Sequence, residues 1–214
     1  MPRCLSQGLL GNEFMMEYRP LGETGLEVSA LGFGCGAVGG ILVEGEYSEM
    51  VRTVAHAVEL GVTYFDTAAI YGDGRSEANL GRVLEELGPE VVVGTKVRLL
   101  AEEMDSIEEA VCKSVEDSLR RLRRDCVDLI QLHNFVALER QPERVWVGVG
   151  DVEAAMGAFQ KLCQQGKVRA WGFNGLGDPP GGAPGAGWKR PDRTDLLQSY
   201  QSLCRCHRAL RIPF

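Results

Sequence analysis

Short apolar runs alternate with amphipathic helical patterns through the middle of the chain. The runs are rich in β-branched and aromatic residues, as strands are, and lie at Leu31–Gly34, Val62–Asp66, Glu90–Thr95, Val127–His133 and Val168–Phe173. Their starts recur every roughly 30 to 40 residues, the length of a strand with its crossover helix. This alternation predicts an α/β fold with a parallel sheet. The period alone fits either a doubly wound sheet or an eight-fold barrel.

Between these runs, apolar residues recur at the spacing of one helix face. The faces expected to pack on the sheet are Val51, Val54, Ala55 and Val58, then Leu80, Val83, Leu84 and Leu87, then positions from Ile107 to Leu122, and last positions from Val152 to Leu162. Ser106 and Glu109 have the spacing of a capping box at the start of the third helix. Asp151 is the expected N-cap of the fourth helix, which Gly166 ends.

A further pair of short strands precedes the first run. Tyr18–Leu21 and Leu26–Ser29 flank Gly22 and Gly25, two residues that favour a tight turn. The segment therefore predicts an amino-terminal β-hairpin that plugs one end of the sheet.

The composition changes at both ends of this organised region. We expect residues 1–15 to be a flexible extension, residues 16–178 to form the incomplete barrel, and residues 179–214 to be an irregular Pro/Gly/Arg-rich tail. Pro179–Gly187 holds only Pro, Gly and Ala, so no regular element is expected there. The tail also has six Lys or Arg residues against two Asp, in a chain that is otherwise acidic. This contrast favours a shifted reading frame or a truncated gene.

The composition of the chain limits the kinds of molecule that it could bind and the compartment in which it is expected. The chain has 214 residues, 44% of them hydrophobic, as in one globular domain or most of one. A net charge of −7 supplies no positive field for nucleic acid. No apolar run reaches the roughly 18 residues of a membrane span, so we expect no membrane partner. The seven cysteines are scattered without a CxxC pair, which favours a reducing, cytoplasmic setting over a disulfide framework.

Cys204, Cys206 and His207 are the densest group of potential metal ligands. A zinc site normally needs four well-spaced ligands, and no second pair lies near them in the sequence. We therefore expect no metal. A metal-dependent barrel hydrolase is a weak alternative for the same reason, since the strand ends carry no second histidine or carboxylate cluster.

Polar residues close three successive apolar runs. Asp66, Lys96 and His133 lie at the carboxyl ends of the second, third and fourth expected strands, and Tyr71 follows Asp66 by five residues. Each of the three also has an ordinary structural explanation: Asp66 as a cap, Lys96 as a solvated strand end and His133 as a core histidine. However, all three residues lie at the same end of their strands. The positions of these strands are inferred from the apolar residues alone, independently of the polar ones. Because parallel strands place reactive groups at this end, we expect one shared site.

These four side chains suit proton transfer to a developing alkoxide. An ammonium group favours the ionised form of a neighbouring phenol and so eases proton loss near neutral pH. Tyr71 would be the acid, Asp66 would keep Lys96 charged and oriented, and His133 would direct a polar oxygen by hydrogen bonding. The set has no hydride source, so a redox cofactor must supply the reducing equivalent.

Four motifs resemble the aldo-keto reductases, over about residues 18–178 and in the expected order. They are Phe65-Asp66-Thr67-Ala68-Ala69-Ile70-Tyr71-Gly72, Gly94-Thr95-Lys96, Asp128-Leu129-Ile130-Gln131-Leu132-His133-Asn134 and Gly166-Lys167-Val168-Arg169-Ala170-Trp171-Gly172. The resemblance implies an α/β fold of the (β/α)8 TIM barrel type, here partial, with strands one to five after the hairpin. It also implies reduction of small-molecule carbonyl compounds with NADPH, with NAD less expected.

The resemblance also implies roles for individual residues. Tyr71 would donate the proton, with Lys96 and Asp66 tuning it, and Tyr71 and His133 would bind the substrate. Gly34, Asp66 and Asn174 would bind the cofactor. These roles agree with the chemistry expected from the residue types alone.

The chain also departs from the family pattern. The family commonly has Ser-Asn after the fifth strand, whereas this chain has Asn174-Gly175, and sixth to eighth strands are not recognisable in the 36 residues after Asp178. We therefore expect an amino-terminal, tetrad-bearing part of a reductase. The alternative is a non-catalytic relic or an interaction subunit that associates through exposed sheet edges. Gly34, Gly36 and Gly39 form a GxGxxG pattern, but the next helical pattern starts too late for a Rossmann loop.

Overall fold

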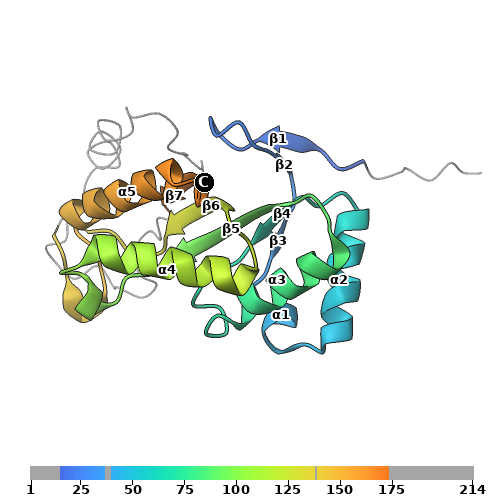
Figure 1. Ribbon diagram of the computed structural model, residues 1–214, viewed down its shortest axis with the longest axis horizontal. Coiled ribbons are helices and arrows are strands. Elements are labelled where there is room, and N and C mark those ends of the chain that lie inside the picture. The colour runs from blue at the N-terminus through green and yellow to red at the C-terminus, as the bar shows by residue number, and fades with distance from the viewer. Residues whose placement is uncertain (1–14, 37–39, 138, 174–214) are drawn as a thin grey trace, which may run out of the picture.

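The computed structural model describes residues 15–36, 40–137 and 139–173. Its centre is a parallel sheet in the order β3-β4-β5-β6-β7 (Figure 1). The strands are β3 (Gly32–Gly34), β4 (Tyr64–Asp66), β5 (Val92–Val97), β6 (Val127–Leu132) and β7 (Val168–Phe173). Each strand pairs with the next strand of the sheet along the chain, so the predicted parallel βα succession is confirmed.

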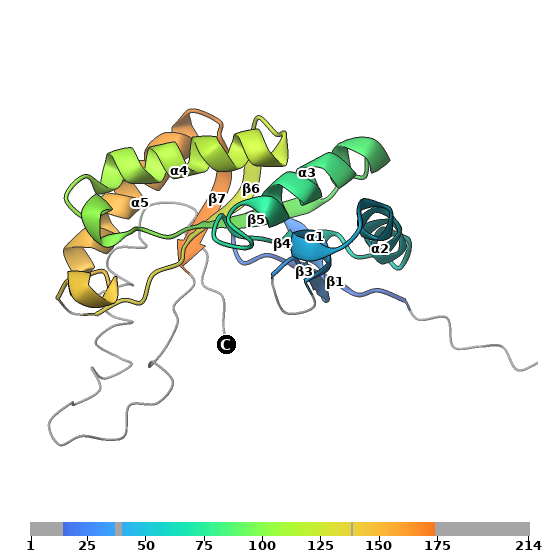
Figure 2. The same ribbon diagram turned by 90° about the horizontal axis from the view of Figure 1, so that it is seen from below.

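The helices lie together on one side of the sheet (Figure 2). They are α1 (Ile41–Glu44), α2 (Tyr47–Glu59), α3 (Arg75–Leu87), α4 (Ile107–Leu122) and α5 (Val149–Gln164), with 3₁₀ turns η1 (Ala101–Glu103) and η2 (Pro142–Arg144). Neighbouring helices pack against one another, α2 on α3, α3 on α4 and α4 on α5. No helix in the described ranges is long and apolar enough to cross a membrane.

The core lies between the sheet and this helical layer. Phe65, Val93 and Ile130 from the strands are fully buried together with Leu80 and Phe159 from the helices. The predicted apolar faces are largely confirmed, because most of their members belong to this cluster. Leu87 is an exception: it is the last residue of α3 and is 37% exposed.

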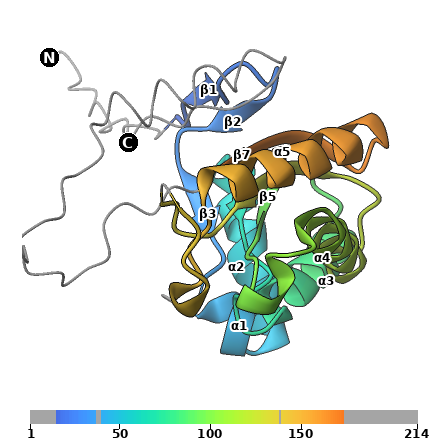
Figure 3. The same cartoon turned by 90° about the vertical axis from the view of Figure 1, so that its left-hand side faces the viewer.

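The predicted hairpin is confirmed as β1 (Tyr18–Pro20) and β2 (Glu27–Ser29), joined by a turn. Ser29 exchanges two hydrogen bonds with Thr63, the residue before β4, at 2.8 and 2.9 Å. The hairpin thus lies at the amino end of β4, and α1, which follows β3, lies toward the other end (Figure 3).

One predicted helix start is confirmed and one is wrong. Ser106 is the N-cap residue of α4, as predicted, but the predicted capping box with Glu109 does not form. The Ser106 side chain makes no cap bond, and the Ser106 N–H, which a capping box would give to Glu109, already donates to the Glu103 carbonyl of η1 at 3.0 Å. Asp151 is not the N-cap of α5, because the helix begins at Val149. The Asp151 carboxylate lies in the first turn, where it accepts the Gly148 N–H at 2.9 Å.

Four of the five sheet strands also differ from the predicted ranges. β3 and β4 begin later than predicted, at Gly32 and Tyr64 instead of Leu31 and Val62. β5 starts and ends two residues later than expected, because the backbone of Thr95, Lys96 and Val97 pairs with β6. Lys96 therefore lies within the strand. β6 ends at Leu132, and His133 follows it. None of these differences moves a predicted site residue away from the carboxyl end of the sheet.

Candidate active site

The site is built where three parallel strands end side by side. Gly34, Asp66 and Gly94 are register partners across β3, β4 and β5. Lys96 lies one pleat further along β5, and the N–H of His133 donates to the carbonyl of Val97 at 2.7 Å. The sheet therefore carries Asp66, Lys96 and His133 to one rim.

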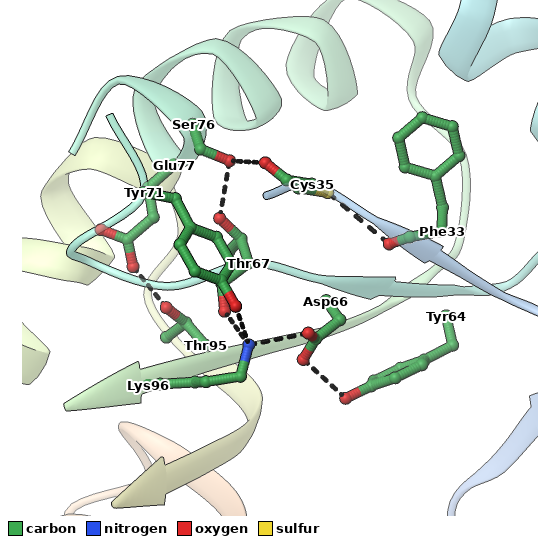
Figure 4. Close-up of polar contacts among 10 residues, drawn as sticks. All are labelled: Phe33, Cys35, Tyr64, Asp66, Thr67, Tyr71, Ser76, Glu77, Thr95 and Lys96. Carbon is green, nitrogen blue, oxygen red and sulfur yellow. Dashed lines mark hydrogen bonds and ion pairs between the residues drawn. The ribbon is translucent and has the colours of Figure 1, made fainter. Parts of the chain in front are cut away.

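The Lys96 ammonium group is the centre of the polar contacts (Figure 4). Its Nζ lies 2.7 Å from Asp66 Oδ2, 2.8 Å from the Thr67 carbonyl oxygen and 3.3 Å from Tyr71 Oη. Lys96 is only 2% exposed, and a buried charge must be paired. An ammonium has three donors, and these three acceptors use all of them. Its position is therefore fixed relative to Tyr71.

The loop between β4 and α3 aims Tyr71 at this ammonium. The Tyr71 N–H donates to the Ala68 carbonyl at 3.0 Å, and the Tyr71 carbonyl accepts the Ser76 N–H at 3.2 Å. Gly72 has a φ of 61°, and a Cβ there would lie 2.4 Å from Val43 Cγ1. Only glycine fits this left-handed, crowded position. The turn thus depends on Gly72.

His133 faces Tyr71 from the neighbouring strand end. The two ring centroids lie 6.2 Å apart with an edge-to-face angle of 85°. Burial, reinforced by the positive charges of Lys96 and Arg98, lowers the pKa of His133 from 6.5 to about 4, against the opposing effect of Asp66. The imidazole is therefore neutral at physiological pH.

The two ring nitrogens of His133 differ in their surroundings. Nδ1 is buried without a hydrogen-bond partner, and it is the sole such side-chain nitrogen or oxygen in the described ranges. A buried N–H without an acceptor is costly. The favoured tautomer therefore carries its proton on Nε2, which leaves a donor available on the open side of the ring.

Sequence reasoning missed Tyr64, which holds the other oxygen of Asp66. Its hydroxyl donates to Asp66 Oδ1 at 3.3 Å. Burial, followed by the charge of Asp66, raises the pKa of Tyr64, so the phenol stays a neutral donor. A Cβ at Gly32 or Gly94 would lie 2.8 or 2.6 Å from Tyr64 side-chain atoms. Gly32 and Gly94, on the two adjacent strands, leave the space that the Tyr64 side chain occupies. These two glycines are the signal in the sequence that could have indicated its direction.

A second set of contacts supports the loop from its outer side. The Ser76 hydroxyl donates to the Cys35 carbonyl at 2.8 Å and lies 2.9 Å from Thr67 Oγ1. Burial, followed by the charge of Asp66, raises the pKa of Cys35, so this residue is a buried thiol and not a reactive thiolate. These contacts tie the end of β3 to the start of α3.

A scan of the sequence against family models matches the aldo/keto reductase family over residues 30–177. The chain belongs to this family. It is 37% identical to L-galactose dehydrogenase of Arabidopsis thaliana over 166 residues, which cover 75% of this chain and 49% of that protein.

Solved aldo-keto reductases show the same arrangement. The holo form of aldo-keto reductase AKR11C1 from Bacillus halodurans matches with a TM-score of 0.58 and 31% identity, covering 76% of this chain and 51% of that one. An aldo-keto reductase from Klebsiella pneumoniae in complex with NADPH matches with a TM-score of 0.59 and 26% identity. The match covers 76% of this chain and 51% of that one. The chain thus spans about half the length of these relatives, and its fold is a partial (β/α)8 barrel.

The cofactor residues implied by the aldo-keto reductase resemblance fall in two places. Gly34 and Asp66 lie next to each other at the rim, and Gly34 has no atom within 4 Å of where a Cβ would be. Asn174 lies outside the described residues. The same is true of Cys204, Cys206 and His207, the group weighed as metal ligands.

Proposed function

We propose that this chain carries the proton-donating part of an NADPH-dependent oxidoreductase that reduces aldehydes or ketones to alcohols. The observation that carries the proposal is the buried Lys96 ammonium, hydrogen-bonded at once to Asp66 and Tyr71 at the carboxyl rim of the sheet. Membership of the aldo/keto reductase family supports the same reaction class.

In this proposal the Tyr71 hydroxyl protonates the carbonyl oxygen as the carbonyl carbon is reduced. The proton leaves Tyr71 Oη for the substrate oxygen, and the negative charge left on Oη lies 3.3 Å from Lys96 Nζ. That ammonium stabilises the charge, and the interaction is strengthened because Lys96 is buried away from bulk water. Asp66 keeps Lys96 in place and compensates the cost of burying its charge.

His133 orients the same oxygen. Its neutral imidazole, protonated on Nε2, can donate a hydrogen bond to the substrate carbonyl and polarise it. A positively charged imidazole is disfavoured here, because the ring is partly buried and because Lys96 and Arg98 already supply positive charge. Tyr71 therefore remains the proton donor, and His133 binds the substrate.

The described part of the rim fits the nicotinamide end of NADPH. Gly34 presents bare backbone with open space before it, next to the partly exposed carboxylate of Asp66. When bound, NADPH supplies the hydride that reduces the carbonyl carbon. The Klebsiella relative in complex with NADPH supports this cofactor over NADH. We also propose the cytoplasm as the compartment, where the free cysteines of the described ranges would stay reduced.

The proposal is tested with the whole 214-residue chain. Purified protein is mixed with NADPH and 4-nitrobenzaldehyde, and loss of reduced cofactor and formation of the alcohol are followed together. We expect both in equal amounts, and a slower reaction with NADH. NADPH binding without alcohol formation, or no binding, would contradict the proposal and support the non-catalytic alternative, a relic or an interaction subunit.

A further inference from the structure

Strand alternation places a second basic residue on the same side of β5 as Lys96. Val93 and Val97 are buried in the core, and the Thr95 hydroxyl donates to Glu77 of α3, so these odd-numbered residues face the helices. Lys96 faces the opposite side, toward Asp66. Arg98 follows β5 with the same parity as Lys96, while Leu99 returns to the core at 0% exposure.

The backbone on both sides of Arg98 is anchored. The Val97 carbonyl accepts the His133 N–H at 2.7 Å, and the Asn134 side chain bonds both the N–H and the carbonyl of Leu99, each at 2.8 Å. Arg98 is thus held at the rim beside His133. Its charge helps to lower the pKa of His133, which agrees with this proximity.

Arg98 is also unpaired. Every other arginine and lysine in the described ranges has a hydrogen bond, an ion pair or an aromatic ring as partner, whereas the exposed Arg98 has none of these with a described residue. Glu103, which follows Arg98 by five residues, accepts the Leu100 N–H at 2.8 Å instead. In a chain of net charge −7, Arg98 is thus an exposed positive charge at the site rim that has no partner among the described residues.

We propose that Arg98 binds a carboxylate group of the substrate, so that the preferred substrate is a carbonyl compound that also carries a carboxylate. The planar guanidinium offers a fork of N–H donors that matches a carboxylate with two parallel bonds. The substrate carbonyl would then lie toward Tyr71 and His133. This inference rests on the proposed function, since it names the substrate class of the same site.

Binding tests the inference without depending on turnover. Imidazole proton resonances of His133, assigned with His133→Asn, are followed by NMR while 4-formylbenzoate or its neutral methyl ester is added. We expect the acid to bind about ten-fold more tightly than the ester, as suits one charge-assisted pair. Arg98→Met should remove this preference and raise the pKa of His133. Arg52→Met, the same change on the exposed face of α2, should do neither.

Two results would overturn the inference: equal affinity for acid and ester in the unmodified chain, or a preference that survives in Arg98→Met. Reduction of the two aldehydes is measured in parallel. If both aldehydes are reduced but the acid is not preferred to the ester, the role of Arg98 is contradicted and the proposed function is not. An acid preference that Arg98→Met removes, without turnover in any variant, contradicts the proposed function but keeps the carboxylate site.

Discussion

Three of the four candidate residues were predictable because the apolar runs set the phase of the strands, and Tyr71 follows the second run by five residues. Asp66, Lys96 and His133 close three such runs, so their meeting at one rim follows from parallel topology. Tyr64 and Arg98 were not predictable in this way. The inward direction of Tyr64 depends on the glycines of the adjacent strands, and the place of Arg98 at the rim depends on the extension of β5 to Val97, which pairing with β6 produces.

The lowered pKa of His133 predicts a pH dependence of stability. Between pH 6.5 and about 4 the unfolded chain takes up a proton at this position and the folded chain does not. Stability is therefore full above pH 6.5 and falls as the pH drops through this window. We expect His133→Asn to show a smaller loss across the window in urea unfolding. An identical loss in both proteins would contradict the burial of a neutral imidazole.

Glu77 is a fully buried carboxylate that joins the site to α4. It accepts the Thr95 hydroxyl at 2.5 Å and Arg121 Nε at 2.6 Å. Glu77→Gln keeps the shape but weakens the bond to Arg121, so we expect a loss of about 1.5 to 3 kcal/mol in the free energy of unfolding. Glu85→Gln, which breaks an exposed pair with Arg123, should cost about 0 to 1 kcal/mol. Equal costs would show that burial of Glu77 is unimportant.

At the scale of elements, periodicity predicted the strands and the helices α2 to α5 but not α1. The predicted starts of α4, β6 and β7 are confirmed, whereas other boundaries differ. The third and fourth predicted helices form. Ser106 caps α4 without a capping box, because its N–H donates to Glu103 of η1, and Asp151 lies inside α5, where its carboxylate pairs with Arg140. Arg140 and Asp151 are 11 residues apart in the sequence, and such a pair leaves no local signal. Boundaries are therefore set by tertiary contacts.

The crossing of α3 and α4 depends on a glycine. A Cβ at Gly81 would lie 2.5 Å from the Leu122 carbonyl carbon and 2.6 Å from the Arg121 oxygen, both backbone atoms. We expect Gly81→Ala to destabilise the chain by about 1 to 3 kcal/mol through forced separation of the helices. Gly157→Ala in α5 meets nothing within 4 Å and should stabilise by about 0.5 to 1 kcal/mol. Opposite signs in urea unfolding are the expected result.

At the scale of the whole molecule, the described part is a barrel segment with two outer strands. β3 and β7 each pair with one neighbour only in the described sheet. Unpaired strand edges favour association with another chain. We expect the purified protein to self-associate with rising concentration in sedimentation velocity. A single monomeric species over a wide concentration range would contradict this expectation.

The central claim is that Tyr71, held by Lys96, gives a proton to a substrate carbonyl. The most direct measurement is the single-turnover rate of alcohol formation by Tyr71→Phe with saturating NADPH. We predict a loss of about 10² to 10⁴ with NADPH affinity unchanged, while Tyr47→Phe, which removes a hydroxyl bonded to exposed Glu86, keeps the original rate. An unchanged rate in Tyr71→Phe would remove Tyr71 from the reaction and contradict the account.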